Sequence, residues 1–138
     1  MLVSAPFIDE ILPSLFEFLG SSEETVVVAH NSPFDLSFLK AASIAHEIPW
    51  PEYVTVDTAR LARAVLERDE VINCKLSTLA QFFGATTSPN HRALDDALAT
   101  VDVLHGLIER LAGFNIYNFE EMRSFPSKKR RAKRPIAE

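Results

Sequence analysis

The sequence predicts an α/β fold that is rich in helix and has two short parallel strands. Residues 25–29 and 53–56 are short runs dominated by β-branched residues. The first of them is an uninterrupted apolar run, which is typical of a strand buried on both faces of a parallel sheet. Around both runs lie segments whose apolar residues recur at helical spacing, so helices are expected to outnumber strands.

The first two helices and the first strand are predicted from their apolar pattern and from residues that cap or end helices. An amphipathic helix is expected over residues 6–19, ending near Gly20. The strand at 25–29 leads to Ser32 and Pro33. This pair is typical of a helix start, because serine caps the free N–H groups and proline fits the first turn.

The second half of the chain is predicted to be mostly helical. Asp57 follows the strand at 53–56 and is expected to cap the next helix. A short helix is then expected over residues 76–83, closed by Gly84. A long helix is expected over residues 92–111.

One face of this long helix is predicted to be buried. At about 100° per residue, six apolar side chains point within about 40° of the direction of Ala97 and form the predicted buried stripe. Its members are Ala93, Ala97, Val101, Leu104, Ile108 and Leu111. Asp95 then falls about 160° away, on the expected solvent face, and Asp96 about 100° away, at the border of the stripe. Asp96 is therefore expected to point toward a site, unless it serves only as a first-turn acid that favours the helix dipole.

Charge is distributed unevenly along the chain. Residues 128–134 hold six of the 14 basic residues, so residues 1–127 keep eight basic and 18 acidic residues, a net charge of −10. A body this acidic is expected to repel phosphate unless a cation intervenes. This argues against a simple basic nucleic-acid-binding domain and leaves a metal-dependent enzyme open.

The length of 138 residues fits one domain. No apolar run approaches the roughly 20 residues of a membrane span, and a signal-peptide pattern is absent from the start. The single cysteine, Cys74, excludes an internal disulfide and a cysteine-rich zinc site. These features predict a protein of the reducing cytoplasm with no membrane partner.

Two motifs resemble those of the DEDDh-type 3′→5′ exonucleases, the family that includes the proofreading epsilon subunit of bacterial replicative DNA polymerase III. Residues 28–39, VAHNSPFDLSFL, resemble its second motif. Residues 91–97, HRALDDA, resemble its third motif, in which a histidine precedes a catalytic aspartate by five residues. The resemblance covers about residues 5–112 and implies a partial ribonuclease H-like exonuclease domain at 1–112. Residues 113–138 then form a polar, later basic, linker or tail.

The resemblance also implies roles for single residues. Asp35 and Asp96 would ligate Mg²⁺ or Mn²⁺, and His91 would be the general base that activates water. Asn31 and Phe34 would contact the substrate, the 3′ end of single-stranded DNA, in replication proofreading or repair. Simpler interpretations stay open: Asp35 as part of a capping box, His91 as an exposed loop residue and Phe34 as a core residue.

The chain departs from the family at the first motif, an Asp-x-Glu on the opening strand, which has no match here. Asp9 and Glu10 are adjacent and lie in a predicted helix, so they are no substitute. We therefore expect a fragment that lacks the first three strands, with weak metal binding and little or no activity. The strand at 25–29 would lose a neighbour, and an open apolar edge favours self-association.

Two other functions remain as alternatives. The chain could be a non-catalytic exonuclease-like binding module, or its substrate could be RNA. The tail, residues 128–134, is either a solvated linker or a nucleic-acid contact. Its sequence context also resembles the connector to a repair-type incision nuclease domain in bacterial fusion proteins.

Overall fold

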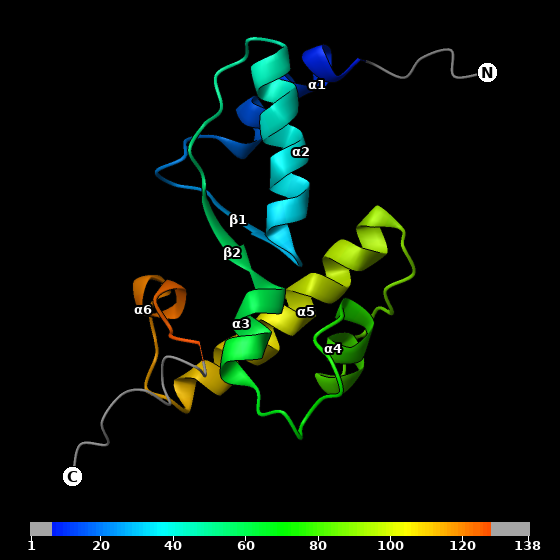
Figure 1. The fold of residues 1–138 in the computed structure, drawn as a ribbon, viewed down its shortest axis with the longest axis vertical. Coiled ribbons are helices and arrows are strands. Elements are labelled where there is room, and N and C mark those ends of the chain that lie inside the picture. The colour runs from blue at the N-terminus through cyan, green and yellow to red at the C-terminus, as the bar shows by residue number, and fades with distance from the viewer. Residues whose placement is uncertain (1–6, 128–138) are drawn as a thin grey trace. The chain divides into compact units, whose positions relative to one another are not determined.

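The computed structural model describes residues 7–127, apart from the side chains of residues 32–35. It confirms the predicted fold class: a helix-rich α/β arrangement with a two-stranded parallel sheet in the order β1-β2 (Figure 1). The elements in chain order are α1 (Ile8–Leu19), β1 (Val26–Ala29), α2 (Ser32–Ala45), β2 (Val54–Asp57), α3 (Thr58–Val65), α4 (Leu76–Phe82), α5 (Ala93–Ala112) and α6 (Phe119–Arg123).

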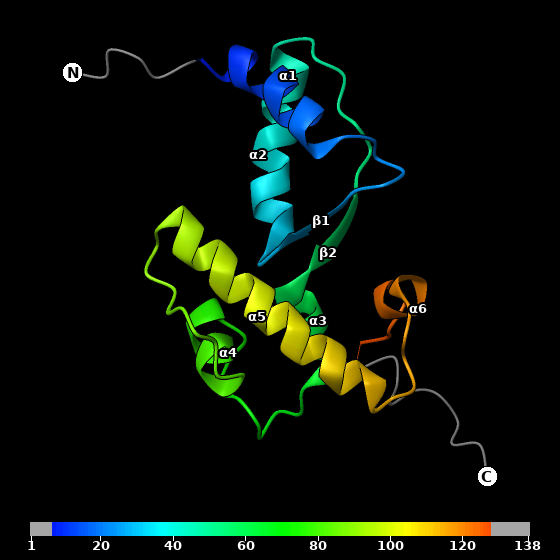
Figure 2. The ribbon, with the colours of Figure 1, turned by 180° about the vertical axis from the view of Figure 1, so that it is seen from behind.

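The chain divides into two compact units. The first comprises the residues up to Val28 together with residues 32–56, and the second comprises residues 29–31 together with those from Asp57 onward. Helices α1 and α2 pack against each other in the first unit. Helices α3 and α4 pack against the long helix α5 in the second, as Figure 2 shows from behind.

An aromatic cluster organises the first unit. The ring of Trp50 meets those of Phe16 and Tyr53 edge-on, at centroid distances of 5.7 and 6.1 Å. Such edge-to-face pairs add stabilisation beyond the area they bury. The Tyr53 hydroxyl also donates to the carbonyl of Gly20 at 3.3 Å. The cluster thus fastens the segment before β2 to the end of α1.

The core of the second unit lies between α3, α4 and α5. Its largest fully buried side chains include Leu61, Val65, Leu79, Val103, Leu107 and Leu111. Asp57 caps α3, as predicted, because its Oδ1 accepts a hydrogen bond from the Ala59 N–H at 3.0 Å. These contacts fix α3 and the start of α5, which both contribute to the site described below.

The predicted buried stripe of α5 is correct only at Leu111 and otherwise wrong. The buried residues are instead Ala99, Thr100, Val103, Leu107 and Leu111, centred about a quarter-turn from Ala97. Both faces carry apolar residues, and the face that packs is the one that includes Thr100. Its hydroxyl can be buried because it donates to the carbonyl of Asp96 at 2.7 Å.

The segment after α5 also contains ordered structure. Asn118 caps α6, its Oδ1 accepting from the Glu121 N–H at 2.8 Å. Phe125 is buried and its ring lies 5.2 Å from that of Phe114. The basic residues 128–134 lie outside the described residues. None of the described helices combines the length and apolarity that a membrane crossing requires.

Gly106 lets the ring of Phe83 approach α5 closely. A Cβ atom at this position would lie 2.2 Å from Cδ1 of Phe83. We predict that Gly106→Ala lowers the free energy of unfolding by roughly 1–3 kcal/mol, because overpacking outweighs alanine's helix propensity gain of about 1 kcal/mol. Urea unfolding followed by circular dichroism measures the change.

A double-mutant cycle provides the control. Phe83→Leu makes room at the same contact, so Gly106→Ala should cost much less in that background. If Gly106→Ala stabilises the wild-type chain, the ring does not constrain this glycine.

Candidate active site

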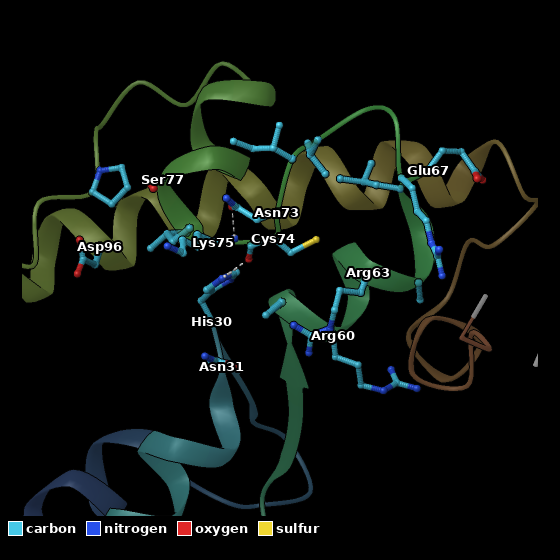
Figure 3. A pocket seen from close by; sticks show the side chains of 18 of the residues that line it. His30, Asn31, Arg60, Arg63, Glu67, Asn73, Cys74, Lys75, Ser77 and Asp96 are labelled. Atoms are coloured by element: carbon cyan, nitrogen blue, oxygen red, sulfur yellow. Dashed lines mark hydrogen bonds between the residues drawn. The ribbon is translucent and has the colours of Figure 1, made fainter. Parts of the chain in front are cut away.

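A cavity of about 1240 Å³ in the second unit brings together three residues that the sequence singled out: Asn31, His91 and Asp96 (Figure 3). Its walls come from the β1–α2 junction, helix α3, the loop before α4 and the start of α5. The volume exceeds the roughly 300–1,000 Å³ of most small-molecule pockets. It is therefore large enough for an extended ligand.

The two carboxylate oxygens of Asp96 differ in their surroundings. Oδ1 accepts hydrogen bonds from the N–H groups of Asn90 and His91, at 3.0 and 3.2 Å. Within the described part of the chain, Oδ2 accepts none. Asp96 also precedes the buried Val103 by seven residues and Leu107 by eleven, so it continues the buried face of α5. One oxygen therefore holds the loop, and the other remains available to a ligand.

The prediction that Asp95 faces solvent is only partly right. This residue is half-buried, and its Oδ2 accepts a hydrogen bond from Nδ2 of Asn90 at 2.7 Å. The difference follows from the shifted buried face of α5, which brings both adjacent carboxylates closer to the packed side. Asp95 does not line the cavity, whereas Asp96 does.

His91 is exposed and lies at the cavity in a left-handed backbone conformation, with φ of 67°. For a residue other than glycine this conformation costs roughly 1–2 kcal/mol. The hydrogen bond from the His91 N–H to Asp96 helps to hold it. The imidazole thus projects from a backbone that the aspartate itself fixes.

Asn31 has a similar backbone, with φ of 64°. Its N–H donates to Oδ1 of Asp57 at 2.8 Å, the same oxygen that caps α3. The Asn31 side chain is exposed at the cavity. Left-handed residues in a site, held by specific hydrogen bonds, are a common sign of function.

His30 lies within the motif at residues 28–39, but the motif predicted no role for it. It is half-buried, with Nε2 2.9 Å from the carbonyl of Cys74 and Nδ1 2.9 Å from Oγ1 of Thr58 (Figure 3). A carbonyl only accepts, so Nε2 carries the proton and Nδ1 of the neutral ring accepts from the threonine hydroxyl. Its place directly after the buried strand was the available signal.

Burial lowers the pKa of His30 from its ordinary value of 6.5. The hydrogen bond to Cys74 and the nearby carboxylate of Asp57 act in the opposite direction, and the charge of Arg63 adds to the lowering. Burial dominates because the charged imidazolium loses its hydration there. The neutral ring is therefore the favoured form in the folded chain.

Asp35 and Phe34 occupy the first turn of α2. Their side chains lie outside the described residues, so their predicted roles stay predictions. Cys74 is a free, half-buried cysteine that lines the cavity.

The donor type fits a hard divalent cation, since Asp96 offers a carboxylate oxygen. Among the described side chains, no group of three acidic, histidine or cysteine residues could hold a metal ion, and the side chain of Asp35, the other predicted ligand, lies outside this set. The described part of the site is therefore one carboxylate beside an exposed imidazole.

A model of the exonuclease family matches residues 1–104. The chain belongs to this exonuclease family. Its fold is the ribonuclease H-like one that the motifs predicted. The family generally uses divalent metal ions.

Curated relatives agree with this assignment. A protein of Mycobacterium tuberculosis named as a bifunctional exonuclease/endonuclease is 48% identical over 141 residues, which cover 100% of this exonuclease chain and 21% of the relative. PolC-type DNA polymerase III of Caldanaerobacter subterraneus is 36% identical over 124 residues, covering 90% of the chain and 8% of the polymerase. The same polymerase of Thermotoga maritima is 33% identical over 127 residues, with 88% and 8% covered.

The exonuclease chain thus spans about a fifth of the first relative and less than a tenth of the polymerases. No solved structure matches it.

The lowered pKa of His30 predicts a pH-dependent stability. The unfolded chain binds more protons between the folded-state pKa and 6.5, so the free energy of unfolding should fall as the pH drops below about 6.5. One proton gives a slope of at most about 1.4 kcal/mol per pH unit. Urea unfolding at a series of pH values measures it.

His30→Gln removes the titration while keeping a donor for Cys74, so the slope below neutral pH should become shallower. His105→Gln, which removes an exposed imidazole on α5, controls for the loss of one histidine. A wild-type slope in His30→Gln would show that another group causes the pH dependence.

Proposed function

We propose that this chain is part of a 3′→5′ exonuclease domain that hydrolyses nucleotides from DNA 3′ ends by a two-metal mechanism. Asp35 and Asp96 are the proposed metal ligands and His91 the proposed general base. The observation that carries the proposal is the free Oδ2 of Asp96 beside the exposed imidazole of His91 on one cavity. A carboxylate and a base next to each other suit hydrolysis of a phosphodiester.

Each residue has a distinct task in this proposal. His91 accepts a proton from the attacking water, a role that imidazole side chains commonly take as general bases. Asn31 and Phe34 position the terminal nucleotide. Asp35 and Asp96 would hold Mg²⁺ or Mn²⁺, which would supply stabilisation of the negative charge on the phosphate and the leaving oxygen.

DNA is favoured over RNA by the names of the relatives, since several are DNA polymerases. Proofreading or repair is the setting that we propose on this ground. Residues 1–112 form the exonuclease part in this proposal, and residues 113–138 form a polar, later basic, linker or tail. The reducing cytoplasm is the proposed compartment, because the cysteine is free.

We also propose that the chain by itself has little or no activity. The sequence contains no Asp-x-Glu, so two of the four acids of the family site are missing. A non-catalytic binding module is the second candidate function. It is favoured by the same observation and by the lack of a three-ligand group among the described side chains.

Measurement of Mn²⁺ binding distinguishes Asp96, the proposed metal ligand, from the adjacent Asp95. We predict weak Mn²⁺ binding by the wild-type chain and a further loss of about 10–100-fold or more in Asp96→Asn, because loss of even an outer-shell partner costs that much. Asp95→Asn is the matched control and should retain wild-type binding. Titration followed by the electron paramagnetic resonance of free Mn²⁺ measures both. Equal losses in the two variants would remove Asp96 from its special role.

The same preparations should show little or no shortening of a 5′-labelled single-stranded oligonucleotide in Mn²⁺. Robust metal-dependent shortening that disappears in His91→Ala would show that the chain suffices for catalysis. It would then overturn the proposed inactivity while supporting the proposed base.

Self-association through the sheet edge is a further part of the proposal. β1 pairs only with β2 in the described sheet, and Val26 at its start is 40% exposed. An apolar strand with an unpaired edge offers N–H and C=O groups to a second chain. The edge can thus pair two copies.

Size-exclusion chromatography with light scattering tests this. We predict a dimer or larger assembly for the wild-type chain and a monomer for Val26→Lys, since charged residues block edge pairing. Val101→Lys, on the exposed face of α5, is the control and should leave the assembly intact. A monomeric wild-type chain, or an assembly sensitive only to Val101→Lys, contradicts pairing through the edge.

A further inference from the structure

Within residues 1–127, positive charge is concentrated at the cavity. Of the eight basic residues within residues 1–127, half line this one cavity. They are Arg60, Arg63, Arg68 and Lys75. The acids among the lining residues are Glu67 and Asp96. A chain with a net charge of −5 therefore presents a locally cationic wall.

Two of these residues share one face of α3. Arg60 and Arg63 are three positions apart, which makes them neighbours on a helix surface. Both are exposed, as is Lys75 just before α4. Figure 3 shows Asp96 at one end of the cavity, Lys75 and His30 nearer its middle, and the two arginines farther from Asp96. The cations thus follow one another away from the carboxylate.

Within the described residues, these cations form no ion pair with protein carboxylates. Among residues 7–127 the recorded ion pair joins Arg110 to Glu70, and neither lines the cavity. None of the four lining cations takes part in an ion pair within that range. Gathering like charges is unfavourable in the free chain, so an anionic ligand with several charges would be bound preferentially.

We propose that Arg60, Arg63 and Lys75 bind the phosphodiester backbone of a single-stranded nucleic acid that leads away from the Asp96 end of the cavity. Arginine suits this role because its planar donors match phosphate oxygens in pairs. The placement of the 3′ end at Asp96 rests on the proposed function. The backbone contact rests on the cavity and its charge alone.

Such contacts orient a strand without reading its sequence. Each phosphate that a cation neutralises releases counterions. For a single strand, each such contact makes the slope of log K against log salt concentration steeper by about 0.7. Two arginine contacts therefore account for about 1.4 of the slope. This salt dependence distinguishes a phosphate contact from a purely structural role.

Binding is measured without cleavage, by the fluorescence anisotropy of a 5′-fluorescein oligothymidylate in EDTA, on the full chain. We expect Arg60→Gln/Arg63→Gln to bind roughly tenfold or more weakly at about 50 mM salt, with the slope reduced by about 1.4. Arg60→Lys/Arg63→Lys keeps the charge and should retain most of the slope. Circular dichroism confirms that the variants fold.

Lys40→Gln/Arg123→Gln is the matched control, since it removes two charges that do not line the cavity. It should bind as the wild-type chain does. Lys128→Gln/Lys129→Gln reports separately on the basic tail. Equal losses in the cavity and control variants, or binding that depends on the tail and not on Arg60 and Arg63, would overturn the proposal.

Failure of this inference and failure of the proposed function give different results. If the chain is no exonuclease, the Mn²⁺ titration fails while binding in EDTA still depends on the two arginines. If the cationic wall is irrelevant, Asp96→Asn still loses Mn²⁺ and the arginine variants bind normally.

Discussion

The two hydrogen bonds of His30 hold the walls of the candidate site together. One reaches Thr58 at the start of α3, and the other reaches the carbonyl of Cys74 in the loop before α4. Asn31, the next residue, is fixed in turn to Asp57. Segments far apart in sequence thus meet through one neutral imidazole. A buried polar group without a partner costs about 1–3 kcal/mol, so losing any one of these hydrogen bonds would be unfavourable.

Asp96 has the corresponding role at one end of the cavity. Its Oδ1 fixes the backbone of Asn90 and His91, and its carbonyl accepts from the hydroxyl of Thr100. The left-handed conformation of His91 is therefore stabilised by the residue proposed to share its chemistry. A substitution of Asp96 would disturb the loop as well as the proposed metal ligand, which is why Asp95→Asn is the necessary comparison.

The sequence predicted features that depend on local interactions. The helix cap at Asp57 and the two strands depend on interactions over a few residues, so the sequence predicts them. The two motifs also predicted the family correctly. The buried face of α5 could not be obtained in this way. That helix has apolar residues on two faces, and tertiary packing against α3 and α4 selected the face with a satisfied threonine. The role of His30 was missed for a similar reason, since both of its partners are distant in sequence.

The net charge predicts the electrostatic force on a ligand at long range, but not at the short distances where contacts form. A value of −10 over residues 1–127 predicts repulsion of a polyanion at long range. Under physiological salt, however, charges more than about 8 Å apart are largely screened, so contact depends on the local arrangement. Arg60, Arg63 and Lys75 form such an arrangement, although acids outnumber bases over residues 1–127 as a whole. In the proposed complex, the acidic surface of residues 7–127 would disfavour binding of a strand outside the cationic wall, because binding there is repulsive. Overall charge can thus contribute to specificity even where it lowers affinity.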